Sequence, residues 1–207
     1  MKTFTMSNRF HIRVFTSYKS YILLFLLFYI FPISAESPPE LNQLLERIRV
    51  EPPALVPFTE QRKNRLLKEP MVLTGYLAYP EAGRLEKVIE TPFREALRVA
   101  GDEVSIERDG ERRRISLRNR TSMRVMLTSI EAIMDGDSAT LASHFDATVT
   151  GNEARWQIEL LPRERRLARQ LSRMVVSGGE QLDSIRFELP DDEWQLLQIR
   201  RYGPVDD

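Results

Sequence analysis

Only a few side chains in this 207-residue sequence have the types and spacing that acid–base catalysis requires. Asp135 stands close to Asp137, and Glu86 stands close to Glu90. Two neighbouring carboxylates can act as general acid and general base when their surroundings push their pKa values apart. The first pair flanks Gly136, where helix capping accounts for both residues, and we expect the second pair to be exposed on a strand face. A hydrolase built on either pair is an alternative that requires a raised carboxylate pKa in a cleft.

Histidine and cysteine, the usual residues of metal and nucleophile sites, are scarce. The sequence has no cysteine and two histidines, and His11 falls within the first 35 residues, which leaves His144. These counts exclude multi-histidine and thiolate metal sites. A Ser-His-Asp triad would have to use His144, yet the sequence has no nucleophile-elbow motif and no glycine-rich phosphate loop. We therefore predict no catalytic residues, no metal and no cofactor, so that the protein is not an enzyme.

The first 35 residues have the pattern of a signal peptide. Basic residues precede the apolar run "YILLFLLFYIF" at 21–31, and "ISA" offers a cleavage point after Ala35. The run is shorter than the ~20 residues of a membrane span. An uncleaved N-terminal anchor is the alternative, but no basic cluster follows the run. We predict a signal peptide over residues 1–35 and a single exported domain over residues 36–207.

Charge and size are those of an ordinary solvated domain. Removing the first 35 residues leaves 26 Lys and Arg against 30 Asp and Glu, with the two signs interspersed. Such a surface is unsuited to nucleic acid, so we predict no nucleic-acid partner. A single domain of this length buries about 70% of the surface of its unfolded chain, so it needs no disulfide.

Hydrophobic periodicity predicts a mainly β fold with helices (α+β). The segment 41–48 has the spacing of a short amphipathic helix with proline in its first turn. From Phe58 the period becomes two, and "RDGE" is a typical hairpin turn. A sheet of about eleven strands rarely stays flat, so we expect it to curl, with helices on its concave side. The strands are predicted near Phe58–Leu67, Met71–Tyr79, Arg84–Thr91, Phe93–Ala100, Glu103–Arg108, Arg112–Leu117, Ala147–Thr150, Arg155–Leu161, Arg173–Ser177, Leu182–Leu189 and Trp194–Tyr202.

Helical segments interrupt the strands after the sixth. Ser122 is expected to cap a helix over Met123–Met134, Gly136 to end it, and Asp137 to cap a second short helix that runs to Phe145. A helical turn is expected within "PRERRLARQLSR". Methionine adapts to ligands of variable shape, so the apolar stripe of the longer helix indicates either an ordinary core helix or a movable lid that contacts ligand. The stripe consists of Met123, Met126, Leu127, Ile130, Ile133 and Met134.

The predicted strand at 71–79 is apolar on both faces, which is unusual for a half-solvated strand. Glycine weakens a strand interior unless something passes close to the backbone or the sheet bends, and a curling sheet with a ligand or lid on its concave side supplies both reasons. The face opposite Gly75 carries the hydroxyls of Thr74 and Tyr76, which require water or a partner. We therefore predict that the face with Gly75, and not the face with Val72, Tyr76 and Val88, lines an apolar cavity. Its predicted lining from these strands is Leu73, Gly75, Leu77, Tyr79 and Leu85.

The segment "FTEQRKNRLLKEPMVLTGYLAYPEAGRLEKVIETP" resembles the opening of LolA-type outer-membrane lipoprotein carriers. The matching positions there are Phe58, Glu60, Gly75, Leu77, Leu85 and Pro92. The likeness continues through "VAGDEVSIERDG", the helix ending "IMDGD" and "WQIELLPRERRLARQLSRMVVSGGEQLDSIRF", where Trp156, Leu160, Pro162, Gly178 and Ile185 match. It extends from about Phe58 to Ile199.

This resemblance implies an open, incomplete antiparallel β-barrel of about eleven strands, with an α-helical lid over an apolar cavity. It also implies a periplasmic carrier, a monomer, that takes acylated cargo from an inner-membrane donor protein to an outer-membrane acceptor protein. The lid would contribute Met123, Met126, Leu127, Ile130 and Met134 to the acyl-binding surface.

Two departures from the best-known carriers concern the cargo. Those carriers have a basic residue and proline where this chain has Glu81-Ala82, and a tryptophan near Lys87. The chain is more similar to divergent LolA-like proteins that occur beside lipid or aryl-polyene biosynthesis genes, so a glycolipid or polyene lipid is an alternative cargo to a lipoprotein. A periplasmic lipid or lipoprotein sensor, or an accessory protein of such a pathway, is the alternative function.

Overall fold

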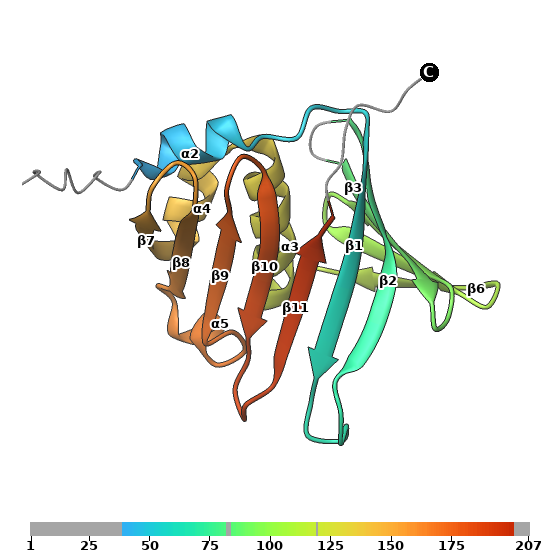
Figure 1. Ribbon diagram of the computed structural model, residues 1–207. Coiled ribbons are helices and arrows are strands. Elements are labelled where there is room, and N and C mark those ends of the chain that lie inside the picture. Colours follow the sequence, from blue (N-terminus) through green and yellow to red (C-terminus); the bar gives the residue numbers. More distant parts are fainter. Residues whose placement is uncertain (1–38, 82–83, 119, 201–207) are drawn as a thin grey trace, which may run out of the picture. The chain divides into compact units, whose positions relative to one another are not determined.

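The computed structural model describes residues 39–81, 84–118 and 120–200, and the predicted signal peptide over residues 1–35 lies outside them. Eleven antiparallel strands form one sheet in the order β6-β5-β4-β3-β2-β1-β11-β10-β9-β8-β7. The ends of this order, β6 and β7, are edges, so the sheet is open and does not close into a barrel. Figure 1 shows that the sheet curls and that α2, α3 and α4 lie on one side of it, which we call the inner face.

Consecutive strands follow one another along the chain except at two places, where helices intervene after β6 and after β8. They are α2 (Leu41–Arg47), β1 (Ala54–Lys63), β2 (Met71–Glu81), β3 (Arg84–Thr91), β4 (Glu95–Ala100), β5 (Glu103–Arg108), β6 (Glu111–Ser116), α3 (Thr121–Asp135), α4 (Ser138–His144), β7 (Phe145–Gly151), β8 (Trp156–Pro162), α5 (Arg165–Ala168), β9 (Arg173–Gly178), β10 (Leu182–Glu188) and β11 (Trp194–Ile199). The predicted fold class and the eleven predicted strands are confirmed.

The largest differences in strand boundaries are at the two ends of β1, which runs from Ala54 to Lys63 and not from Phe58 to Leu67. Proline cannot donate to a strand ladder, yet Pro57 lies within β1. The Pro57 carbonyl accepts from the amide of Arg200, one residue past the end of β11. The position without an N–H therefore lies at the end of the pairing between β1 and β11, which begins at Phe58.

Helix termini agree with the prediction at Gly136 and Asp137 and disagree at two other places. Gly136 ends α3 in the left-handed conformation with φ 76°, and the Asp137 side chain accepts from the Thr140 amide at 3.0 Å. Ser122 does not cap α3, because the helix begins at Thr121 and Ser122 is buried within its first turn. The first helix begins at Leu41, so proline precedes it and does not occupy its first turn.

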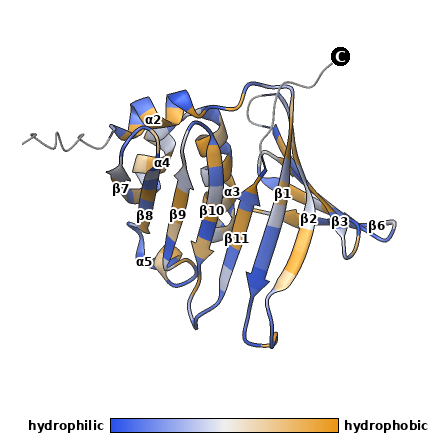
Figure 2. Ribbon diagram, in the orientation of Figure 1, coloured by the Kyte–Doolittle hydropathy of each residue, from blue (hydrophilic) through white to orange (hydrophobic). Residues whose placement is uncertain are grey.

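The main hydrophobic core lies between the helices and the inner face of the sheet. Figure 2 shows hydrophobic and hydrophilic residues alternating along β9 and β10, as expected for strands buried on one face. Trp156 and Phe145 are among the largest fully buried side chains, and Leu45 brings α2 into the same core cluster. The indole Nε1 of Trp156 donates to the carbonyl of Gly179 at 2.7 Å, which satisfies its polar atom inside the core.

Gly75 is required by the approach of the neighbouring strand and not, as we had predicted, by a ligand or lid. A Cβ at this position would lie 1.9 Å from the Val88 carbonyl oxygen of β3. The pairing of β2 with β3 shifts register between Thr74 and Gly75, which brings the two backbones together. The sequence also predicts that the sheet bends at this glycine, and the shift in strand register agrees with that prediction.

Candidate ligand-binding cavity

An apolar cavity of about 440 Å³ lies between the inner face of the sheet and α3. Its volume is within the range of small-molecule binding sites. Most of its lining is hydrophobic, and the charged lining residues come from β1, β3 and β4. The lining residues are Glu60, Arg62, Leu77, Leu85, Lys87, Ile89, Glu95, Leu97, Val104, Ile106, Met123, Met126, Leu127, Ile130, Gln170, Phe187, Gln195 and Leu197.

The alternation of side chains along the strands and the helical repeat of α3 place these side chains on the cavity wall. Leu77 pairs with Lys87 across β2 and β3, and Lys87 pairs with Leu97 across β3 and β4, so the three side chains share the inner face. The α3 residues at 123, 126, 127 and 130 follow the spacing that puts side chains on one face of a helix. The strand face and the helix stripe therefore meet across the cavity.

Six of the ten predicted ligand-binding residues lie on this wall, and four do not. Leu77, Leu85, Met123, Met126, Leu127 and Ile130 line the cavity. Leu73, Tyr79 and Met134 are almost fully buried in the core cluster, where other side chains and not the cavity surround them. Gly75 is covered by the backbone of β3. The inner face of β2 thus continues from the cavity into the packed core.

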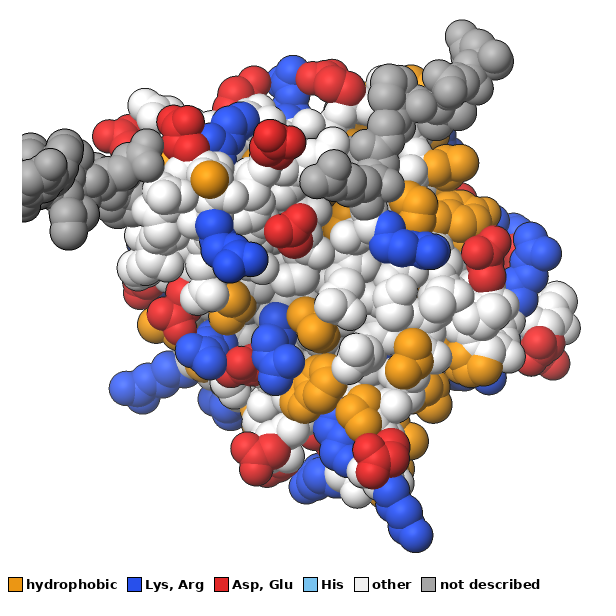
Figure 3. Space-filling view, in the orientation of Figure 1, with side chains coloured by type: hydrophobic (Ala, Val, Ile, Leu, Met, Phe, Trp, Pro, Cys, Tyr) orange, Lys and Arg blue, Asp and Glu red, His pale blue; other side chains and the backbone are white. Residues whose placement is uncertain are grey.

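The outer face of the same strands does not contribute to the cavity. Val72 is 54% exposed, and Val88 is buried on the outer side of β3. Figure 3 shows hydrophobic side chains interspersed with charged ones on this side of the protein. The outer face of β2, which is also apolar, is therefore partly exposed to solvent and partly packed against β3.

A polar cluster on the cavity wall was not predicted from the sequence. Glu60 carries a charged side chain, yet it is only 2% exposed. It lies on the inner face of β1, the face that also carries Phe58. Its carboxylate accepts from Arg62 at 2.9 Å and 3.2 Å and from the Lys87 ammonium at 2.5 Å. The alternation of side chains along each strand could have indicated this cluster. It places Lys87 on the same face as Leu85, and Glu60 on the same face as Phe58.

The two cations keep Glu60 ionised inside the protein. Burial acts to raise the pKa of the Glu60 carboxyl, but the Lys87 ammonium and the Arg62 guanidinium outweigh it and hold that pKa below its ordinary value. Burial lowers the pKa of Lys87, and the Glu60 carboxylate offsets this only in part. A buried carboxylate with two charged donors is stabilised as an anion.

We expect the stability that Glu60 contributes to be lost in acid. Because its pKa is lowered from 4.5 in the folded protein, the contribution is present above that value and disappears as the pH falls through the folded-state pKa. The melting temperature of the wild type should exceed that of Glu60→Gln at neutral pH, and the difference should shrink between about pH 5 and about pH 3. A difference that stayed constant over this range would show that the cations do not stabilise the Glu60 anion.

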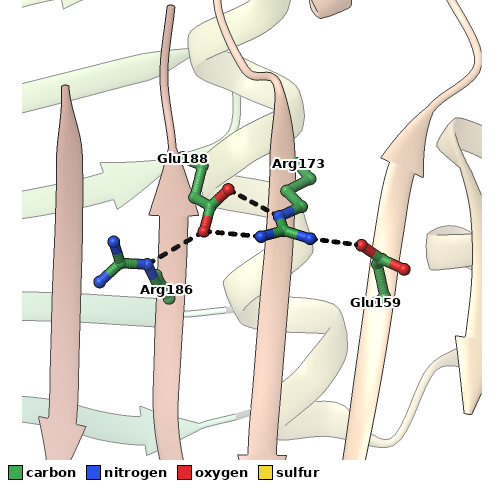
Figure 4. A network of polar contacts seen from close by, with 4 residues as sticks. All are labelled: Glu159, Arg173, Arg186 and Glu188. Atoms are coloured by element: carbon green, nitrogen blue, oxygen red, sulfur yellow. Dashed lines mark hydrogen bonds and ion pairs between the residues drawn. The ribbon is translucent and has the colours of Figure 1, made fainter. Parts of the chain in front are cut away.

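Charged side chains on the outer face of the sheet form ion pairs with one another, and they are more exposed than Glu60. Arg173 donates to Glu188 at 2.6 Å and to Glu159 at 2.8 Å, and Arg186 donates to Glu188 at 3.1 Å (Figure 4). The hydrogen bonds that Arg173 donates to the Glu188 and Glu159 carboxylates raise its pKa. All four side chains are partly exposed, so water and salt screen their interactions. The Glu60 carboxylate, by contrast, is almost fully buried beside the cavity.

The carboxylate pairs considered for catalysis are apart from the cavity. Glu86 pairs with Arg98 at 2.7 Å on the outer face, and Glu90 is exposed. Burial and the neighbouring Asp137 raise the pKa of Asp135, whereas Asp137 itself caps α4. None of these four residues lines the cavity.

His144 ends α4, half-buried, and lines no part of the cavity. Within residues 39–81, 84–118 and 120–200, no group of three or more His, Asp or Glu side chains is placed to hold a metal ion. Among the described helices, none combines the length and hydrophobicity of a bilayer-spanning segment.

Comparisons with known proteins place the chain in a family. Residues 34–189 match the family model described as outer membrane lipoprotein carrier protein LolA-like. Among solved structures, the chain is similar to a LolA superfamily protein from Nitrosomonas europaea, with 11% sequence identity, a TM-score of 0.45, and coverage of 81% of this chain and 93% of that chain. It is also similar to lipoprotein LppX from Mycobacterium tuberculosis, with 13% identity, a TM-score of 0.43, and coverage of 83% and 99%. Among curated proteins, none matches the sequence.

Proposed function

We propose that this protein, which belongs to the outer membrane lipoprotein carrier protein LolA-like family, binds the acyl chains of its cargo in the cavity between the sheet and α3. Members of this family are generally not enzymes, and the proposed activity is binding and transport without chemical change. The observation that carries the proposal is a cavity of about 440 Å³ whose wall is mainly aliphatic. Hydrocarbon that moves from water into such a cavity gains about 25 cal/mol for each Å² of apolar surface that it buries.

The proposal gives α3 the role of a lid. Its stripe of Met123, Met126 and Ile130 faces the strands across the cavity, and Leu127 also packs against the smaller core cluster of β4 and β5. Methionine side chains adjust to hydrocarbon of different shapes at low cost. Movement of α3 away from the sheet would open the cavity along one side without breaking strand pairing.

The proposal also includes a route for the cargo. The protein would act in the periplasm as a monomer, taking acylated cargo from an inner-membrane donor protein to an outer-membrane acceptor protein. The cargo would be a lipoprotein or a lipid, including the glycolipid and polyene classes. Residues 36–207 would be the exported form, released by cleavage after Ala35.

We expect the purified protein to bind fluorescent fatty-acyl probes saturably and to release them unchanged when unlabelled acyl ligand is added. The apolar lining supplies the affinity, and the distant carboxylate pairs supply no chemistry at the cavity. Binding is measured by fluorescence titration, and products are measured by chromatography of the recovered probe. Turnover that is lost in Asp135→Asn or Glu90→Gln would contradict the carrier function and favour a hydrolase.

A further inference from the structure

The polar cluster on the cavity wall contains two cations and one carboxylate. Arg62 and Lys87 both pair with Glu60, and among the described residues no other carboxylate lies within ion-pair distance of either. Glu95 also lines the cavity, but its ion pair is with Arg108 at 3.9 Å. Glu95 nevertheless attracts Lys87 electrostatically, and Glu60 is the one carboxylate in direct contact with the two cations among the described residues.

Lys87 has hydrogen-bonding capacity that the protein leaves unused. An ammonium group has three N–H donors, and the Lys87 Nζ bonds to Glu60 and lies 5.0 Å from the centre of the Phe58 ring. The side chain is 20% exposed and lines the cavity. On the same sheet face its neighbours are the apolar Leu77, Leu85, Ile89 and Leu97 and the carboxylate of Glu95, which attracts it from β4.

An unpaired charge in apolar surroundings is costly unless an opposite charge is brought close to it. The lowered pKa of Lys87 reflects this cost, because burial disfavours its charged form more than Glu60 favours it. A ligand that carries its own anionic oxygen atoms would supply the missing partner through charge-assisted hydrogen bonds. A neutral ligand of the same length would leave the charge unpaired.

We infer that Lys87, with Arg62 beside it, binds the carboxylate of a long-chain monocarboxylic acid whose hydrocarbon chain lies along α3. This inference rests on the proposed function and names the ligand class of the same cavity. Two cations share one carboxylate within ion-pair distance, so a monoanion adds one opposite charge, whereas a doubly charged phosphate monoester would add two beside Glu60 and Glu95. The wall that faces the hydrocarbon is formed by Met126 and Ile130 on the helix side and Leu77 on the strand side.

A second hollow beside the β5–β6 hairpin is the alternative place for an anionic head. It shares Glu95 and Ile106 with the cavity. Its arginines are matched by an equal number of carboxylates, and exposed arginines bind anions weakly because water competes. The charged residues of this hollow are Glu95, Arg108, Asp109, Glu111, Arg113 and Arg120. The exposed Arg113 provides a matched control, because it is a cation outside the cavity.

Two ligands of equal chain length test the inference. Displacement of a fluorescent fatty-acyl probe gives the Kd of hexadecanoate and of hexadecanol, which differ only in the head group. We expect the wild type to bind hexadecanoate about tenfold more tightly than hexadecanol. The affinity ratio should fall to about one in Lys87→Met, stay well above one in Lys87→Arg, and keep its wild-type value in Arg113→Gln.

Each result of this experiment has a defined meaning. Equal binding of both ligands by the wild type overturns the inference and leaves the proposed function standing, whereas binding of neither overturns the proposed function itself. A ratio that is kept in Lys87→Met overturns the inference, and if it is also lost in Arg113→Gln the head lies in the second hollow. A melting curve of each variant detects loss of folding, in which case Lys87→Gln replaces Lys87→Met.

Discussion

Replacing Gly75 with alanine is expected to lower the free energy of unfolding by about 3 kcal/mol or more, or to prevent folding. The added Cβ would lie 1.9 Å from the Val88 carbonyl oxygen and 3.0 Å from the Ile89 Cα. Both are backbone atoms of a paired strand, so no side-chain rotation can relieve the contact. Urea unfolding of the variant, followed by circular dichroism, measures the loss.

The matched control for this prediction is Gly101→Ala, in the turn between β4 and β5. Gly101 has φ of 54°, and a Cβ there would meet no atom within 4 Å. The control therefore carries only the backbone strain of the left-handed conformation, about 1 to 2 kcal/mol. Similar losses in the two variants would show that the close approach of β3 does not determine the need for glycine at position 75.

Introducing a charge at Met126 is expected to reduce acyl-probe affinity at least tenfold. Met126 is partly buried, lines the cavity from α3 and packs against the main core cluster. A lysine there would bring a further cation into the apolar space that the hydrocarbon needs, and an uncompensated charge in such surroundings is costly. Fluorescence titration of Met126→Lys with the acyl probe measures the effect.

Thr128→Lys is the control, because Thr128 lies on the same helix and does not line the cavity. It introduces the same side chain into α3 and should leave probe binding close to the wild-type value. Melting temperatures of both variants separate a loss of binding from a loss of folding. If Met126→Lys bound the probe as well as the wild type at equal stability, α3 would not be the lid of the binding cavity.

The sequence by itself determined the elements and their faces. A period of two predicted the strands, and a turn such as Asp109-Gly110 predicted a hairpin, because both signals depend on residues close together in the chain. The left-handed Gly136 and the capping Asp137 were correct for the same reason. The LolA-like family was also recognised from local motifs and is confirmed by the match over residues 34–189.

Parity along the strands correctly separated the inner face of β2 from its outer face. Leu77 lies on the cavity wall, while Val72 is exposed on the other side. Spacing along α3 placed Met126 and Ile130 on the cavity wall in the same way. These predictions needed only the direction in which each side chain leaves its own element.

Only the tertiary structure decided which part of the inner face is cavity and which part is core. Leu73 and Tyr79 share the face of Leu77, yet they are buried in the core cluster. Parity cannot distinguish these residues, because the difference depends on where the helices cover the curled sheet.

The Glu60 cluster and the crowding at Gly75 arise from the same long-range geometry. Glu60 meets Lys87 across the width of β2, and Gly75 meets the Val88 carbonyl where the register of β2 and β3 shifts. Both contacts depend on strand register and sheet curvature, which are set by the packing of the whole domain and not by any short segment of sequence.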